Sequence, residues 1–116
     1  MIRYKNQLEK LLNLKDGWLD GDGLAPDKEG LEWLITLLET YPSDMSTFYI
    51  YPTPSGDVQL EWSIGSYEIE LVIDLTNHTA EWYTLNMLTK KDETTQANLD
   101  TDFEYIIKSI RYYESL

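Results

Sequence analysis

Aspartates and glycines alternate around Trp18 in the segment Lys15–Pro26, whose residue types come nearest to those of a metal site. A calcium loop of the EF-hand type needs oxygen ligands at positions one, three and five, glycine at six and glutamate at twelve. Counting from Asp16 puts Trp18 at position three and Asp27 at position twelve, and an indole ring cannot bind calcium. The segment also lacks the Gly-Lys-Ser/Thr ending of a phosphate-binding loop. We therefore expect a connection between two helices, with Trp18 and Leu19 anchoring it on the core.

The other reactive residue types form no recognisable catalytic arrangement. The chain has no cysteine, which excludes disulfides and thiolate chemistry, and its single histidine, His78, falls in a predicted surface turn. Glu61 and Glu70 could approach each other like the two carboxylates of a retaining glycosidase, about 5–5.5 Å apart. A flat sheet face in so short a chain offers no obvious cleft around such a pair. We expect no enzyme activity, no catalytic residues, no metal site and no cofactor.

Composition limits the class of protein and its partners. The 116 residues, 42% of them hydrophobic, fit a single domain over residues 1–116. The net charge of -12 argues against direct binding of nucleic acid or an anionic membrane, because like charges repel. The N-terminus lacks the apolar core of a signal peptide, and no stretch approaches the roughly 18 apolar residues of a membrane span. We expect a cytoplasmic protein.

Apolar residues at helical spacing predict three helices. Pro26 suits the first position of the second helix, because its missing N–H would be unpaired there in any case. Thr101 and Glu104 match a capping box at the start of the third helix. The predicted ranges are about 2–14, about 26–40, and from 101 to near the C-terminus.

Between the second and third helices the apolar period changes to two, which predicts four strands. They cover about residues 47–52, 58–64, 67–75 and 80–88, and the polar stretch 90–99 is expected to be a long loop. Hairpin-length connections imply an antiparallel meander. Three helices covering one face of this sheet make an α+β, two-layer sandwich of order ααββββα.

The distribution of charge along the chain is its most informative feature. All nine lysines and arginines fall in residues 3–28 and 90–111. From Glu29 to Thr89, which includes the whole predicted sheet, there are ten acids and no lysine or arginine. The sheet should therefore carry an acidic solvent face, which serves either as a binding surface or only for solubility.

The predicted turns set which acids face one another. A two-residue turn at Gly65-Ser66 puts Glu61 opposite Glu70, and a turn centred on Asn77-His78 would put Asp74 opposite Glu81. Opposed like charges destabilise a sheet, so this arrangement suggests a function. Tyrosines alternate onto the same face and suit the anchors of an interface. The predicted partner-binding residues are Glu61, Glu68, Glu70, Asp74, Glu81, Tyr49, Tyr51 and Tyr83.

Two stretches resemble a group of small bacterial and phage-borne proteins of unassigned activity. In these proteins a "DGW" loop rich in glycine and proline precedes a "PTP-G-VQLEW" hairpin, and residues Trp18–Pro26 and Tyr51–Trp62 are similar to the two motifs. The resemblance spans about residues 16–83. It implies the fold and no catalytic residues, and its setting among mobile elements suggests a toxin antidote or an inhibitor of a defence enzyme.

These observations predict a non-enzymatic acidic binding protein that covers a basic, nucleic-acid-binding surface on a protein partner. A toxin, a nuclease or a defence complex would present such a surface, as the targets of anti-CRISPR and immunity proteins do. The alternative is a structural or assembly subunit that self-associates, or docks in a larger complex, through its sheet face. Salt should weaken the first kind of complex and favour self-association of so negative a face.

Overall fold

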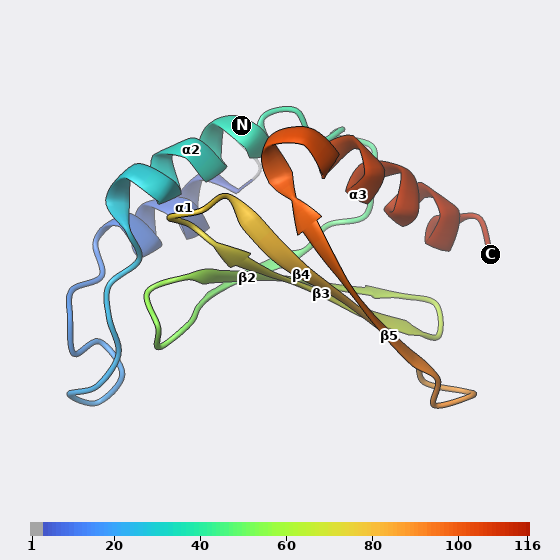
Figure 1. The fold of residues 1–116 in the computed structure, drawn as a ribbon, viewed down its shortest axis with the longest axis horizontal. Helices are drawn as coiled ribbons and strands as arrows, with labels where there is room; N and C mark the ends of the chain where they lie inside the picture. Colours follow the sequence, from blue (N-terminus) through green and yellow to red (C-terminus); the bar gives the residue numbers. More distant parts are fainter. Residues whose placement is uncertain (1–3) are drawn as a thin grey trace.

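The structure, a computed structural model, describes residues 4–116. Within that range the predicted α+β class with three helices and an antiparallel sheet is confirmed, but the sheet has five strands, not four. Figure 1 shows the three helices on the same side of the sheet. The elements are α1 (Lys5–Leu12), α2 (Lys28–Leu38), β1 (Tyr49–Pro52), β2 (Val58–Ile64), β3 (Tyr67–Asp74), β4 (Thr79–Asn86), β5 (Asp92–Asn98) and α3 (Leu99–Glu114).

The sheet is a meander in which neighbouring strands in the sequence are neighbours in space, in the order β1-β2-β3-β4-β5. Ile64 pairs with Tyr67 across Gly65-Ser66, so the predicted two-residue turn and its register are confirmed. Gly65 has a φ of 58°, the left-handed conformation that such a turn requires. The register of the central hairpin therefore follows from the turn and from the alternation of apolar side chains.

Strand β5 occupies the stretch that was expected to be a loop. It pairs with β4 over seven positions, from Leu85↔Asp92 to Thr79↔Asn98. Its side chains show no apolar alternation, and six of its seven residues are exposed. A strand at the edge of a sheet needs little buried side-chain area because its backbone pairing holds it in place. Hydrophobic periodicity consequently cannot detect it.

Both long helices begin at a different residue from the predicted one. Asp27 is the N-cap of α2 and accepts a 2.8 Å hydrogen bond from the Gly30 amide, so Pro26 precedes the cap. α3 follows β5 directly, and the side chain of Asn98 accepts a 3.0 Å hydrogen bond from the Asp100 amide. The predicted capping box at Thr101 is wrong. The helix begins earlier, and the side chain of Asn98, three residues before Thr101, is the N-cap that accepts a hydrogen bond from a free backbone amide.

The core fills the space between the sheet and the helices. Trp62 of β2 is 1% exposed, and its ring centroid lies 5.1 Å from that of Phe48 and 5.9 Å from that of Trp82. Its indole N–H donates a 3.2 Å hydrogen bond to the hydroxyl of Tyr41. The surrounding core includes Leu8, Leu31, Leu34, Leu38, Leu60, Ile69, Leu71, Ile73, Ile106 and Ile110.

Helix α2 approaches the β3–β4 turn so closely that only glycine fits at position 30. A methyl group there would lie 2.5 Å from the Cβ of Leu75 and closer still to its carbonyl oxygen. Leu75 itself is fully buried, although it follows the last residue of β3. This contact fixes the end of β3 against the helical layer.

The connection between α1 and α2 contains a short hairpin of its own. Leu19 and Asp22 exchange backbone hydrogen bonds of 2.8 and 2.9 Å around Asp20-Gly21, and both central residues have positive φ. This is the type I′ geometry that the Asp-Gly pair favours. The glycine-rich segment is thus an ordered, hydrogen-bonded connection. The sequence interpretation of a turn between two helices is confirmed.

The predicted anchoring of this connection is wrong in part. Leu19 is 44% exposed, and Trp18 lies over Gly23 within the loop, donating a 2.8 Å hydrogen bond to the carbonyl oxygen of Leu24. The loop is held instead through its backbone, because the Leu24 amide donates to Pro54 in the β1–β2 turn at 2.9 Å. Backbone pairing leaves the apolar side chain of Leu19 free of the core.

Candidate functional site: the open face of the sheet

The side of the sheet opposite the helices carries a row of tyrosines and glutamates that crosses four strands. In the register, Tyr49 of β1 is paired with Glu61 of β2, Glu61 with Glu70 of β3, and Glu70 with Tyr83 of β4. Adjacent strands lie about 4.8 Å apart, so these four side chains are direct neighbours. The structure therefore brings together two predicted carboxylates and flanks them with two predicted tyrosines.

Negative charge on Glu70 is unfavourable in the folded protein. Its pKa is raised by partial burial first, and then by the negative charges of Glu61 and Glu68. A raised pKa means that the ionised form is held at a free-energy cost in the folded protein. A positive group placed over Glu70 would offset this cost.

No positive charge on the sheet compensates these acids. The five strands contain seven acidic residues and no lysine or arginine. Basic residues of the described range lie on the three helices, in the α1–α2 connection and in the β4–β5 turn. Arg111, for example, binds Asp44 on the helical side with two hydrogen bonds of 3.1 and 3.2 Å. The seven strand acids are Glu61, Glu68, Glu70, Asp74, Glu81, Asp92 and Glu93.

The two tyrosines of β1 form an exposed aromatic pair at one side of this face. Tyr49 is 67% exposed and Tyr51 is 45% exposed. Their ring centroids are 6.3 Å apart and their planes differ by 25°. Two large, nearly parallel rings held by a strand offer contact area at low entropic cost, as interface anchors do.

Tyr83 on β4 is less accessible and is linked to a residue that the sequence interpretation missed. Its hydroxyl lies 3.5 Å from a carboxylate oxygen of Asp92 on β5. Its pKa is raised by burial first, and then by the charge and hydrogen bond of Asp92 and by Glu70. Asp92 belongs to this face because of β5, and no apolar pattern in the sequence marks that strand.

Glu68 and Glu81 both lie on the face but have different neighbours. Glu68 accepts a 2.7 Å hydrogen bond from the Ser63 hydroxyl, which confirms the predicted pairing of these residues. Glu81 is exposed and lies opposite Val72, so its predicted pairing with Asp74 is wrong.

Asp74 stabilises the β3–β4 turn. It pairs with Thr79, and its carboxylate accepts hydrogen bonds of 3.0 and 3.1 Å from the amides of Thr76 and Asn77 and 2.9 Å from the Asn77 side chain. These bonds, led by that of the Asn77 side chain, lower the pKa of Asp74. The turn has four residues because Leu75 leaves the strand to enter the core, which shifts the register from the predicted one.

His78 lies in this turn, as predicted, but it also joins two helices. Its ring stacks on that of Trp33 in α2, with centroids 3.7 Å apart and planes 2° from parallel. Its Nδ1 is 3.0 Å from both carboxylate oxygens of Asp100 in α3. Neither partner is near in sequence, so the contacts follow only from the tertiary structure. Their geometry indicates a structural role for His78, which connects the β3–β4 turn of the sheet to the helical layer.

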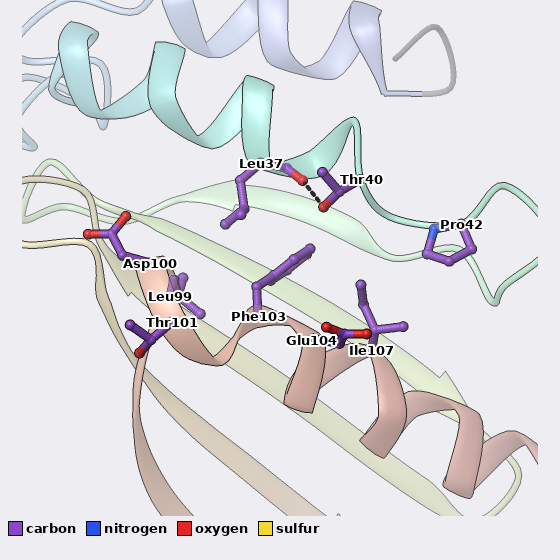
Figure 2. A pocket seen from close by; sticks show the side chains of 9 residues that line it. All are labelled: Leu37, Thr40, Pro42, Leu99, Asp100, Thr101, Phe103, Glu104 and Ile107. Atoms are coloured by element: carbon purple, nitrogen blue, oxygen red, sulfur yellow. Dashed lines mark hydrogen bonds between the residues drawn. The ribbon is translucent and has the colours of Figure 1, made fainter.

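A hollow of about 480 Å³ lies between the end of α2 and the first half of α3. Figure 2 shows Leu37, Phe103 and Ile107 lining it, with Asp100 and Glu104 among the acidic side chains around it. Its size is that of a small-molecule site. Asp100 is already bonded to His78, however, and no nucleophile paired with a base lines the hollow.

The described residues offer no further class of site. Across positions 4–116, no three histidine, aspartate or glutamate side chains come together to hold a metal ion. In the glycine-rich connection, Asp16 accepts a 2.9 Å hydrogen bond from the Ala25 amide and so closes the loop itself. No helix in this part of the chain is long and apolar enough to cross a membrane.

Comparison with protein-family models, with curated proteins and with solved structures finds no match to this chain.

Proposed function

We propose that the open face of the sheet binds a basic surface on a protein partner and covers it without catalysis. The observation that carries the proposal is the opposed pair Glu61 and Glu70, flanked by Tyr49 and Tyr83 and left without a cation in any strand. Each directly opposed like-charge pair destabilises a sheet by about 0.2–1 kcal/mol. A basic partner would convert that unfavourable repulsion into attraction.

The spacing of the acids favours a partner that normally binds nucleic acid. Carboxylates on this face repeat at about 5 Å across strands and about 7 Å along a strand, which are the spacings of a sheet. A nucleic-acid-binding protein displays a positive surface built to contact regularly spaced phosphates. A toxin, nuclease or defence complex with such a surface would be blocked by this face, in the manner of an antidote, anti-CRISPR or immunity protein.

The tyrosines would supply the apolar part of the contact. Tyr49 and Tyr51 expose large rings beside the acids, and interfaces concentrate their binding energy in such aromatic residues. The carboxylates would set the association rate and its dependence on salt, because long-range attraction steers the encounter.

The test is capture from a lysate of the source cell, with charge reversal on one face and a matched control on the other. The binding variant carries Glu61→Lys, Glu70→Lys and Glu81→Lys. The control carries Glu29→Lys, Glu32→Lys and Glu104→Lys, three exposed acids of α2 and α3 with the same change in net charge. Asp74 stays unchanged in both variants because it holds the β3–β4 turn.

The expected result is a nucleic-acid-binding protein retained by the wild type and by the control but lost from the binding variant. Salt and added heparin should release it, because both compete for the charged surface. Equal capture by all three proteins would contradict the proposal. Loss from the control alone would move the site to the helical side and its hollow.

The alternative, an assembly subunit that self-associates through the same face, predicts the opposite response to salt. The net charge of -12 makes two such faces repel, so high salt would strengthen their contact. Sedimentation in low and high salt of the binding variant and of the control variant separates this outcome from binding to a basic partner, because only self-association through the open face would differ between the two.

A further inference from the structure

The two edges of the sheet differ in whether their backbone groups are paired. At the β1 edge, the Ile50 amide donates a 3.3 Å hydrogen bond to the side chain of Gln7, and the Phe48 amide donates one of 3.3 Å to the hydroxyl of Tyr4. Side chains from the α1 end of the chain therefore close this edge. The β4–β5 side of the sheet ends in a strand that no further element pairs with among residues 4–116.

The alternation of an antiparallel ladder shows which groups of β5 point away from β4. The Asn86 amide donates a 2.9 Å hydrogen bond to the carbonyl oxygen of Lys91, which sets the phase of the ladder. It follows that every second residue of β5 directs its backbone N–H and C=O groups outward, away from β4. These residues are Asp92, Thr94, Gln96 and Asn98. Asn98 agrees with this phase, because its amide donates to Asp102 at 3.1 Å on the outer side.

Three consecutive outward positions are left without a hydrogen-bond partner in the described part of the chain. These are the backbone groups of Asp92, Thr94 and Gln96, all of which are exposed residues. Such a row is a template for another strand, and soluble proteins usually cover or interrupt it. An uncovered row of this kind can accept a strand.

We propose that β5 pairs antiparallel with β5 of a second copy of this chain, about a two-fold axis at Thr94. In this register the Thr94 residues of the two copies face each other, and Asp92 of each copy faces Gln96 of the other. All three unpaired positions are then satisfied by six backbone hydrogen bonds, two per outward-facing pair. Asn98 keeps its bond to Asp102.

In this arrangement the charged residues of β5 in one copy face uncharged residues of β5 in the other copy. No acid faces an acid, because Asp92 meets Gln96 and Glu93 meets Thr95 of the other copy. Like charges directly opposite would be destabilising, so this register is the favoured one. At the ends, Lys90 and Lys91 approach the start of the other copy's α3, where Asp100 and Asp102 lie.

Helix α3 carries two exposed tyrosines, Tyr105 and Tyr112. Tyr112 lines a hollow together with Tyr67 of β3, Asn86 of β4 and Glu93 of β5. Tyr105 lies two turns earlier on the same face of the helix, and the two tyrosines are 58% and 59% exposed.

The consequence is a continuous ten-stranded sheet. Because the two-fold axis is perpendicular to the sheet, the open faces of both copies lie on one side and the helices on the other. The acidic face would be doubled in extent. This inference concerns the edge of the sheet and does not depend on what the open face binds.

Sedimentation velocity over a range of protein concentrations tests the pairing, using two substitutions at the axis. Thr94→Pro removes an outward N–H and blocks strand addition, while the bonds to β4 come from the neighbouring residues and stay intact. Thr94→Val keeps the N–H and is the matched control. We expect dimers for the wild type and Thr94→Val, and only monomers for Thr94→Pro with an unchanged circular dichroism spectrum.

A wild type that stays monomeric at millimolar concentration, or a dimer that persists in Thr94→Pro, would overturn the proposal. Amide hydrogen exchange of the wild type provides a readout that does not depend on how the proline variant folds. The amides of Thr94 and Gln96 should become protected as concentration rises. Exchange that is independent of concentration at both amides would equally overturn it.

Charge substitutions at position 96 test the register. Each dimer contains two pairs of position 96 with Asp92 of the other copy. The lysine of Gln96→Lys would attract Asp92 in both pairs, and the glutamate of Gln96→Glu would repel it in both. We expect the dissociation constants of the two variants to differ by about tenfold. The same two substitutions at Gln59 on β2 change the net charge equally but lie far from the edge, so a similar difference there would contradict the register.

Discussion

The two faces of the sheet differ in what their side chains contact and in what they contribute to stability. On the helical face, Trp62, Leu71 and their neighbours are almost completely buried in one continuous core. On the open face, Glu61 and Glu70 oppose each other without a cation. The buried face therefore supplies the free energy of folding, and this surplus allows the open face to carry an unfavourable charge pattern.

The largest effect should come from opening the buried face. Trp62→Ala should lower the free energy of unfolding by about 3–5 kcal/mol, because it removes a buried ring and leaves a cavity. Tyr49→Ala removes a comparable ring from the exposed side and should change it by less than about 0.5 kcal/mol. Urea unfolding followed by circular dichroism compares the two. Equal losses would show that the open face is as tightly packed as the core.

A smaller substitution tests how closely the helical layer approaches the sheet. Gly30→Ala should lower the free energy of unfolding by about 1–3 kcal/mol, because the added methyl group collides with Leu75. At an unobstructed helical site the same change would be stabilising by up to about 1 kcal/mol. The sign of the change in the free energy of unfolding, measured with urea, therefore shows whether position 30 is in close contact with Leu75. Glu29→Ala, on the neighbouring exposed residue, is the control and should be nearly neutral.

On the open face, removing a charge should be stabilising. Glu70→Gln should raise the free energy of unfolding at neutral pH by about 0.2–1 kcal/mol, because the repulsion from Glu61 disappears. Solvent screening at this partly exposed site keeps the gain small.

The pH dependence of this gain follows from the raised pKa of Glu70. The folded protein binds the proton more tightly than the unfolded chain, so stability falls as pH rises through the interval between the two pKa values. The advantage of Glu70→Gln should therefore be full above the folded-state pKa and vanish below the unfolded one. Thermal unfolding across acidic and neutral pH measures it, and an advantage that grew on acidification would contradict the assignment.

The smallest effect on stability should come from Glu81→Gln. Glu81 has the same chemistry and the same face but lies opposite Val72, so its substitution should be neutral within about 0.5 kcal/mol. Both glutamines should nevertheless weaken binding of a basic partner, since each removes one charge from the proposed contact. Unfolding and binding measurements on the two variants would thus separate the cost of the opposed pair from the role of the face.

The central hairpin and the helices could be predicted from the sequence because local chemistry specifies them. Gly65 provides the turn, the apolar alternation of β2 and β3 faces the core, and together they set Glu61 opposite Glu70. The apolar stripes of α2 and α3 likewise mark the surfaces that they bury. The acidic character of the open face follows directly from these elements.

Other features depend on contacts between distant residues, which periodicity cannot show. β5 is a strand only because β4 offers its backbone, and it adds Asp92 beside Tyr83 and an unpaired edge. Leu75 leaves β3 because α2 packs against it, and this contact moves Asp74 away from Glu81. The local apolar periodicity of the sequence therefore determined which side chains could face solvent. The pairing of strands and helices in the tertiary structure decided which of these side chains are neighbours.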